Sequence, residues 1–429
     1  MRVTLTTLGA RGDTQPFVTL GHELRSRGHD VRIAAPAVYS DVVHEAGLEL
    51  IPLPGDPGEF LPGRAWKSLD EDRLAARVGR TTSAVRLSRA LSVLPQHTLE
   101  DRRELVELLG SACKGADLVV NSVLTRPYHL LVEDPTPWAA VCLIPQSSTG
   151  AFPAFGAPPL PLGSPYNRLT HLARRQWEWH CARGPVNRVR RGSGHRPLGL
   201  RSPLRAMGEK NPILYPFSPS LVPPPADWPA NCHMTGFWYW DRTTWEPSAD
   251  LRAFVEEGSP PVVFTMGSLW PLHRRYGIFA MAWEAVRKAG RRMVFVGADD
   301  GEELPPGVFQ VTEADHRWLF PRASCVIHHG GLGTMSQALR AGVPQMSVPA
   351  LVDQPYFAER LTELGVASAP VPLAGLSAPK FAASVDECLR NPDLVRRAAQ
   401  VARSVRQEPG VTRAAEALES WVGAGCPGM

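Results

Sequence analysis

A glycine-rich turn in the last third of the chain carries residue types that suit phosphate binding. Residues 328–334 read His-His-Gly-Gly-Leu-Gly-Thr, after an apolar run and before a helical pattern. Glycines let backbone N–H groups approach an anion, and a helix start adds unpaired N–H groups and a partial positive charge. A histidine at the strand end and Thr334 at the helix start can add hydrogen bonds. The turn predicts a phosphate site; the alternative is a turn that serves only close packing.

Asp13 is a second candidate, in the segment Gly9-Ala10-Arg11-Gly12-Asp13 directly after the first apolar run. An open α/β sheet keeps its sites at the carboxyl ends of its strands, where this loop would lie. Asp13 is therefore a candidate general base that removes a proton from a hydroxyl; the alternative is a helix cap. An ordinary aspartate has a pKa of about 3.9, so we expect partial burial or a late proton transfer to assist it.

The elements that must position these residues start with a strand, a helix and a strand. In the first half of the chain, Pro16 suits the first turn of a helix at 16–27, and Gly28 suits its end. This βαβ start predicts a parallel sheet covered by helices. The strands are predicted at 2–8, 30–35, 48–53, 117–121 and 138–144.

A second αβ series follows a different middle region. Residues 145–230 are rich in proline, glycine, arginine and tryptophan, which disfavours regular sheet there, and 237–249 reads as a linker. Two doubly wound sheets in one chain are the simplest fold class for this pattern. In the second half, strands are predicted at 261–265, 292–296, 309–312, 325–328 and 345–348, with helices near 276–289, 334–341, 355–364, 378–390 and 394–406.

Composition excludes several classes of function. The chain has 429 residues, 44% of them hydrophobic, and a net charge of +4, which is too small for a dedicated nucleic-acid binder. Its seven cysteines are scattered and never form a CxxC pair, so neither a disulfide framework nor a zinc site is predicted. No apolar run suits a signal peptide or a membrane span, and a cytoplasmic protein is expected.

One segment is unusually basic. Residues 168–205 contain ten arginines and a single acid, Glu178, together with two tryptophans. Such a run is typical of a solvated helix face. The alternative is a surface that meets a large acceptor or anionic lipid, which would be a peripheral membrane contact. Aromatic residues nearby, including Phe152 and Phe155, either line an apolar acceptor cleft or belong to the core.

Several motifs, in the right order over nearly the whole chain, resemble GT-B glycosyltransferases of family 1. The branch that they resemble most holds the sterol glucosyltransferases and the antibiotic glycosyltransferases. Residues 315–373 carry the strongest likeness, with the His-His-Gly-Gly-x-Gly-Thr run, Ala-Gly-Val-Pro and Asp-Gln. The loop at 9–17 is similar to the Gly-x-Arg-Gly-Asp-x-x-Pro loop of that branch, and 234–238 and 265–268 also match. The match is weakest in 55–230.

The resemblance implies two Rossmann-like doubly wound domains that face a central cleft. Residues 1–236 would be the N-terminal acceptor-binding domain, 237–249 the linker and 250–407 the donor-binding domain, with a final helix at 408–425 packing back on the first domain. It also implies a metal-independent, inverting hexosyltransferase without a cofactor. In such an enzyme, Asp13 would deprotonate an acceptor hydroxyl, which attacks the anomeric carbon opposite the diphosphate.

By the same resemblance, the donor would be a UDP- or dTDP-linked hexose or deoxyhexose. The glycine turn and a neighbouring loop would face its diphosphate, and Arg11 would offset the negative charge. A carboxylate beside an amide, at 353 and 354, suits sugar hydroxyls; the alternative there is a helix N-cap ahead of Pro355. Base recognition is left open within 311–316. The predicted donor-binding residues are Arg11, Gly12, Gly267, Ser268, His316, His328, Gly330, Gly331, Gly333, Thr334, Asp353 and Gln354.

Three features depart from the family pattern. Ala10 stands where relatives often have a serine, which removes one hydrogen-bond donor. Plant members use a histidine on the first loop, but no histidine precedes His22 here. The base-stacking tryptophan of the plant signature is not recognisable, since Trp318 reads as a packing residue beside Leu319 and Phe320.

We expect an acceptor that is a lipophilic small molecule with a hydroxyl, such as a polyketide or macrolide aglycone or a sterol-like compound. The alternative function is a catalytically silent, nucleotide-sugar-binding partner of another glycosyltransferase. A dinucleotide oxidoreductase is excluded because Gly9 and Gly12 do not complete a GxGxxG motif. The acidic triplet Asp70-Glu71-Asp72 has the spacing of a metal-binding Asp-x-Asp, but it lies in a charged, helix-like segment and reads as solvated. The sequence does not predict the oligomeric state.

Overall fold

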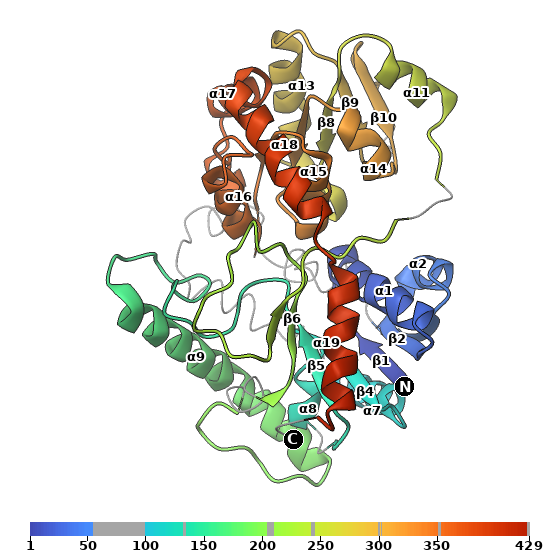
Figure 1. Ribbon diagram of the computed structural model, residues 1–429, viewed down its shortest axis with the longest axis vertical. Coiled ribbons are helices and arrows are strands. Elements are labelled where there is room, and N and C mark those ends of the chain that lie inside the picture. The colour runs from blue at the N-terminus through green and yellow to red at the C-terminus, as the bar shows by residue number, and fades with distance from the viewer. Residues whose placement is uncertain are drawn as a thin grey trace.

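The computed structural model describes residues 1–54, 99–131, 134–203, 210–241, 245–298, 301, 303–350 and 353–426. It has two lobes, one above the other in Figure 1, and each is built on a parallel sheet. This arrangement confirms the expected pair of doubly wound α/β units. Among the described residues, no helix has the length and apolar character that crossing a membrane requires. The acidic triplet at 70–72 lies outside the described ranges.

The N-terminal lobe holds a 7-stranded sheet in the order β3-β2-β1-β4-β5-β6-β7. Neighbouring strands are parallel, and the central ones are runs of buried side chains, as strands covered on both faces must be. The strands are β1 (Arg2–Thr6), β2 (Asp30–Pro36), β3 (Glu49–Leu53), β4 (Leu118–Ser122), β5 (Trp138–Val141), β6 (Ile213–Tyr215) and β7 (Cys232–Met234). The helices are α1 (Arg11–Ser26), η1 (Ala37–Tyr39), α2 (Ser40–Glu45), α7 (Leu99–Cys113), α8 (Tyr128–Leu131) and α9 (Gly163–Gly192).

The C-terminal lobe holds a 5-stranded parallel sheet in the order β10-β9-β8-β11-β12. Its strands are β8 (Val262–Thr265), β9 (Met293–Val296), β10 (Val308–Val311), β11 (Cys325–His328) and β12 (Gln345–Ser347). Its helices are α11 (Ala249–Glu256), η2 (Gly267–Leu269), α12 (Trp270–Arg274), α13 (Ile278–Lys288), α14 (His316–Leu319), η3 (Phe320–Arg322), α15 (Leu332–Ala341), α16 (Gln354–Glu363), η4 (Leu373–Gly375), α17 (Ala378–Arg390) and α18 (Pro392–Arg406), before α19 (Val411–Gly423).

Two local predictions are wrong. The first helix begins at Arg11 rather than at Pro16, so that Asp13 lies in its first turn and not in a loop. The position of Pro16 misplaced the start of the helix. Proline is most common in the first turn of a helix, but it is not confined to that turn. The proline-rich middle region also contributes β6, a three-residue strand at the far side of β5. That strand is too short to produce an alternating pattern in the sequence.

The last helix belongs to the N-terminal lobe. After α18, the chain returns downward to the N-terminal lobe (Figure 1), where α19 packs against α1. Ala414, Ala415 and Leu418 are fully buried in the same core as Phe17 of α1. At the edge of this contact, Nη1 of Arg27 lies 3.0 Å from Oε2 of Glu419.

A shared apolar cluster joins the two lobes. Phe217 follows the N-terminal sheet and Phe357 lies on α16; both are fully buried, and their ring centroids are 6.0 Å apart in an edge-to-face contact. Leu339 of α15 and Val401 of α18 belong to the same cluster, as does Tyr215 of β6. The lobes are therefore packed together at this cluster and are not connected by the linker alone.

Replacing Leu418 with alanine should lower the free energy of unfolding by about 2–5 kcal/mol, because the side chain is fully buried between α19 and the N-terminal core. Thermal and urea unfolding measure the change. Leu169→Ala is the matched control: its side chain is 60% exposed, so a change below about 0.5 kcal/mol is expected. Equal losses in the two variants would contradict the packing of α19.

Candidate active site

The glycine turn lies between a buried strand and a helix start. All four residues of β11 are buried, and α15 begins directly after Gly331. Gly330 has φ +89°, and a Cβ there would lie 3.3 Å from the backbone oxygen of Gln354, so only glycine fits. In the described part of the chain, no side chain caps α15, whose N-cap residue is Gly331. Its first-turn N–H groups therefore have no intrahelical acceptor and can bind an anion.

His328 supports this turn from inside the protein. Its Nδ1 accepts the N–H of Gly330 at 2.9 Å, and its Nε2 lies 2.9 Å from Oε1 of Gln345, to which it donates. The ring is completely buried, and burial lowers its pKa to about 4. Because both ring nitrogens are used, the expected direct contact of His328 with a diphosphate is not available in this structure. His328 instead fixes the backbone that forms the turn.

His329, which the sequence analysis did not single out, faces the turn instead. A Cβ on Gly331 would lie 2.2 Å from its Nε2, and one on Gly267 would lie 3.1 Å from its Cε1. The ring therefore fills the space between two glycine loops. Burial, together with the charges of nearby histidines, lowers its pKa to about 3, and its Nδ1 has no hydrogen-bond partner among the described residues. The doubled histidine was the available signal, but its spacing could not show which ring faces the pocket.

The neighbouring loop comes from β8, which pairs with β11 so that Thr265 lies opposite His328. Gly267 and Ser268 follow that strand and are exposed. Gly333 is also exposed and Thr334 is half-buried, both in the first turn of α15. The structure thus brings the predicted residues of the two loops to the same sheet edge.

Asp353 and Gln354 stand at the start of α16. Asp353 occupies the N-cap position and makes no capping hydrogen bond to the inner first turn, although hydrogen bonds from the backbone at Asp353 and Gln354 favour its charged form. Burial, reinforced by the negative charge of Asp13, raises the pKa of the Asp353 carboxyl to about 7. Oε1 of Gln354 accepts the N–H of Ala350 at 2.9 Å, and that oxygen is therefore occupied by the protein.

Asp13 makes the helix-capping contact that was the alternative to its predicted role as a base. Its Oδ2 accepts the N–H of Ala10 at 2.9 Å, which fixes the carboxylate in the first turn of α1. Burial raises its pKa to about 6, although the hydrogen bond from Ala10 acts in the opposite direction. Gly9 has φ +110°, and a Cβ there would lie 2.5 Å from Oδ2 of Asp13. The capping bond thus holds a carboxylate whose pKa suits a general base.

Three other predicted residues lie near the junction of the lobes. Nη2 of Arg11 pairs with Oε1 of Glu313 at 3.1 Å, an ion pair between the lobes in which both side chains are about half exposed. The role of Arg11 against a diphosphate stays a prediction, and it would require Arg11 to leave this ion pair. Gly12 is exposed and has open space around its Cα. The ring of His316 stacks on Phe320, with centroids 4.2 Å apart, and burial lowers its pKa to about 4.

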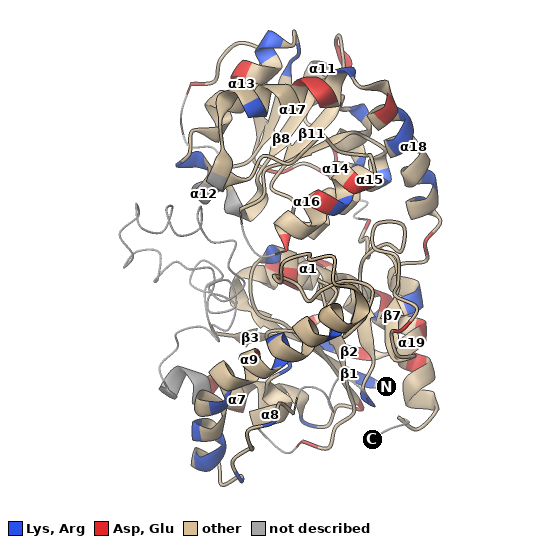
Figure 2. Cartoon of the chain, turned by 90° about the vertical axis from the view of Figure 1, so that its left-hand side faces the viewer, with Lys and Arg blue, Asp and Glu red and all other residues tan. Residues whose placement is uncertain are grey.

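These contacts place the two carboxylates on opposite sides of the lobe junction. Figure 2 shows α1 directly below α16, and the pKa of Asp353 responds to the charge of Asp13. The glycine turn lies against Gln354 on the upper side. Among the described residues, no three histidines, cysteines or acids gather in a way that could hold a metal ion. The arrangement places an uncapped helix start on one lobe and a carboxyl with a raised pKa on the other; an anion cradle and a general base at these positions stay predictions.

Two family models match this chain. Residues 296–421 match the model described as Erythromycin biosynthesis protein CIII-like, C-terminal domain. Residues 3–89 match the model of the Glycosyltransferase family 28 N-terminal domain. The first match covers most of the C-terminal lobe and much of α19, and the second begins with β1 of the N-terminal lobe.

Known relatives match nearly the whole chain. The O-mycaminosyltylonolide 6-deoxyallosyltransferase of Streptomyces fradiae is 42% identical over 424 residues, which is 98% of this chain and 97% of that protein. A sterol 3-beta-glucosyltransferase of Aspergillus clavatus is 30% identical over 97% of this chain, but the chain spans only 29% of that protein's length. The crystal structure of glycosyltransferase VinC in complex with DTDP has the same fold, with a TM-score of 0.66, 19% identity and coverage of 99% of this chain and 100% of that one. This chain therefore belongs to the GT-B glycosyltransferases, in the group that contains antibiotic and sterol glycosyltransferases, and is a hexosyltransferase.

Proposed function

We propose that the protein moves a hexose or deoxyhexose from a dTDP- or UDP-sugar to a hydroxyl of a lipophilic small molecule, with inversion at the anomeric carbon. The observation that carries this proposal is that Asp13 on one lobe lies close enough to Asp353 on the other for its charge to raise the pKa of Asp353, next to the glycine turn that packs on Gln354. A sugar held by the upper lobe would then present its anomeric carbon to an acceptor held by the lower one.

Asp13 would act as the general base. With a pKa of about 6 it is ionised near neutral pH and still basic enough to accept a proton from a hydroxyl as the new bond forms. The acceptor oxygen bonds to the anomeric carbon while the bond from that carbon to the diphosphate oxygen breaks. Because attack and departure occur on opposite faces, a single displacement inverts the configuration.

The leaving diphosphate would be neutralised by the protein backbone. The first turn of α15 offers N–H groups and the positive end of the helix dipole. Neutral His329 and exposed Ser268 stand beside that turn. Such fixed dipoles supply the charge stabilisation that a departing phosphate needs. Asp353, raised to a pKa of about 7, would accept a hydrogen bond from a sugar hydroxyl.

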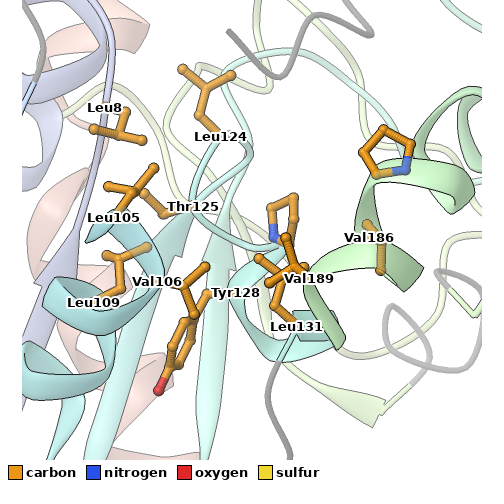
Figure 3. A pocket seen from close by; sticks show the side chains of 12 residues that line it. Leu8, Leu105, Val106, Leu109, Leu124, Thr125, Tyr128, Leu131, Val186 and Val189 are labelled. Atoms are coloured by element: carbon orange, nitrogen blue, oxygen red, sulfur yellow. The ribbon is translucent and has the colours of Figure 1, made fainter. Parts of the chain in front are cut away.

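The relatives favour particular substrates. The Streptomyces fradiae relative is named for transfer of a 6-deoxyallosyl group to O-mycaminosyltylonolide, and the VinC structure holds DTDP. A dTDP-linked deoxyhexose and a macrolide-like acceptor are therefore the first substrates to test. The structure adds an apolar pocket of about 50 Å³ between α7, α8 and α9, lined by Leu8, Leu109 and Val189 among others (Figure 3). Leu8 directly precedes Gly9, so this pocket suits an alkyl branch of an acceptor near the base.

A catalytically silent nucleotide-sugar-binding partner remains the alternative function. It would need the anion cradle but not a buried carboxylate opposite it. The elevated pKa of Asp13 favours the enzyme, because a carboxyl that served only as a helix cap would be more stable with an ordinary pKa. Donor binding without product formation, over a panel of dTDP- and UDP-sugars and hydroxylated acceptors, would support the silent partner instead.

Asp13→Asn should lower kcat by about a hundredfold or more, because the amide cannot accept the proton. The affinity for dTDP should stay within about twofold of the wild-type value. Turnover assays measure kcat, and titration with dTDP measures the affinity. The variant should be at least as stable as the wild type at pH 8, because burial disfavours the charged carboxylate above its folded pKa. Unchanged turnover would remove Asp13 from the role of base.

The pH dependence of kcat/KM should show an acid limb. Asp13 must be ionised to act as base, and burial raises its pKa to about 6; activity should therefore fall about tenfold per unit below pH 6. The Asp353 carboxyl has a pKa of about 7, so its protonation should begin to lower the activity at a higher pH. The apparent pKa of the profile therefore belongs to the two carboxyls together. A profile that stays flat down to pH 4.5 would show that the base is an unshifted carboxylate.

Gly9→Ala should lower kcat by about tenfold to a hundredfold, because the new Cβ would displace the Asp13 carboxylate from its bonded position. Gly184→Ala on α9 is the control, since its Cβ meets nothing within 4 Å. Steady-state kinetics at saturating donor separate the two. Full activity in Gly9→Ala would mean that the position of Asp13 is not critical.

A further inference from the structure

A second cavity of the N-terminal lobe lies apart from the glycine turn at residues 328–334. Its volume is about 430 Å³, which is within the range of pockets that hold drug-sized molecules. One wall comes from Cys142, just after β5, and from Tyr215 at the end of β6. The other wall comes from α9, which runs along the outside of the lobe (Figure 1). The cavity is large enough for a small molecule, whereas the apolar pocket of about 50 Å³ is not.

Arginines dominate the charge of this cavity. Arg126 approaches from the loop after β4, and Arg174 and Arg175 come from α9; Glu178 is the acid in the lining. Nε of Arg174 pairs with Oε1 of Glu178 at 2.7 Å. Burial, and then the positive charges of Arg174 and Arg175, lower the pKa of His171, which keeps that ring neutral at neutral pH. The lining therefore has an excess of positive charge.

Arg126 holds an unused hydrogen-bond donor. Its Nε is buried and meets no hydrogen-bond partner in the described part of the chain. Its side chain is only partly exposed. A buried donor without an acceptor is unfavourable, and proteins rarely leave one unsatisfied. The acceptor that matches a guanidinium best is an oxyanion, a carboxylate or a phosphate.

The remaining wall suits an apolar body. Tyr215 is fully buried; its ring stacks on Trp228 with centroids 4.6 Å apart, and its hydroxyl accepts the N–H of Ser147 at 2.9 Å. Cys142 and Ile213 add apolar surface. The cavity thus combines a cationic end with a rigid, largely apolar wall, and a molecule of matching chemistry has an apolar body and one acidic group.

The cavity adjoins the junction of the lobes. The guanidinium of Arg174 lies 5.4 Å from the ring centroid of Phe155. Phe155 in turn contacts Tyr356 of α16 edge to face, with centroids 6.2 Å apart. Tyr356 is three residues beyond Asp353 on the same segment. A molecule in this cavity is therefore held on the N-terminal side of the proposed reaction centre.

We infer that this cavity binds the acceptor through an oxyanion, a carboxylate or phosphate ester, that pairs with Arg126. The identification of the acceptor as the carrier of that group rests on the proposed function, whereas oxyanion binding does not. Free inorganic phosphate has the same chemistry without an apolar body. The test must therefore separate an acidic amphipathic molecule from a free anion.

This test is isothermal titration calorimetry of the full chain. dTDP is present throughout, to occupy the predicted phosphate site at the glycine turn. The probes are cholate, which is a hydroxylated steroid carboxylate, its uncharged methyl ester, and inorganic phosphate. Cholate should bind at least about tenfold more tightly than the ester, because hydrogen bonds to charged groups are the stronger ones. Arg126→Gln should abolish that difference and leave dTDP affinity unchanged. Arg188→Gln, which makes the same charge change on the exposed face of α9, should preserve it.

Equal affinities for cholate and its ester would overturn the inference, as would an undiminished difference in Arg126→Gln. Tight binding of phosphate without binding of cholate would also overturn the inference. The cavity would then bind a free anion and not an acceptor that carries an acidic group. If Arg126→Gln does not fold, ionic strength decides in the wild type: added salt must weaken cholate binding and spare the ester. Cholate binding of this kind in a chain that transfers no sugar would contradict the proposed function alone.

Discussion

The proposed reaction centre depends on a half-buried carboxylate that the backbone holds in place. Asp13 is fixed by the N–H of Ala10, and Asp353 approaches it from the other lobe. Burial is the main reason that the pKa values of both carboxyls rise, and repulsion from the charge of Asp13 adds to the rise at Asp353. A sugar that develops positive charge at its anomeric carbon would lie between them and relieve that repulsion. In the proposed reaction, the two carboxylates would therefore stabilise an oxocarbenium-like transition state more than the neutral sugar.

On the opposite lobe, a short chain of hydrogen bonds sets the anion cradle. Gln345 on β12 accepts from His328 on β11, and His328 accepts the N–H of Gly330. The turn is thus shaped before any ligand arrives, which is the condition for strong electrostatic stabilisation. The sequence does not show which of the two adjacent histidines turns into the core; in the structure it is His328, while His329 lies between the two glycine loops.

Sequence patterns predicted the C-terminal lobe well and the junction poorly. Strands such as Cys325–His328 are buried on both faces and read as apolar runs, so their bounds were predicted to within one or two residues. The start of α1 was missed because the Asp13–Ala10 bond, rather than a proline, defines it. The Arg11–Glu313 pair and the Phe217–Phe357 contact join segments more than a hundred residues apart. No local periodicity encodes such contacts.

The contacts between the lobes are unequal, and this inequality constrains how the site opens. Separating Phe217 from Phe357 would expose side chains that are completely buried, at about 1.5–3 kcal/mol for each. The Arg11–Glu313 pair is about half exposed on both sides and contributes at most about 1 kcal/mol. Motion that admits a nucleotide sugar should therefore break the ion pair first and pivot on the aromatic cluster. Because Arg11 lies two residues from Asp13, its release would also free a cation beside the base when the donor enters.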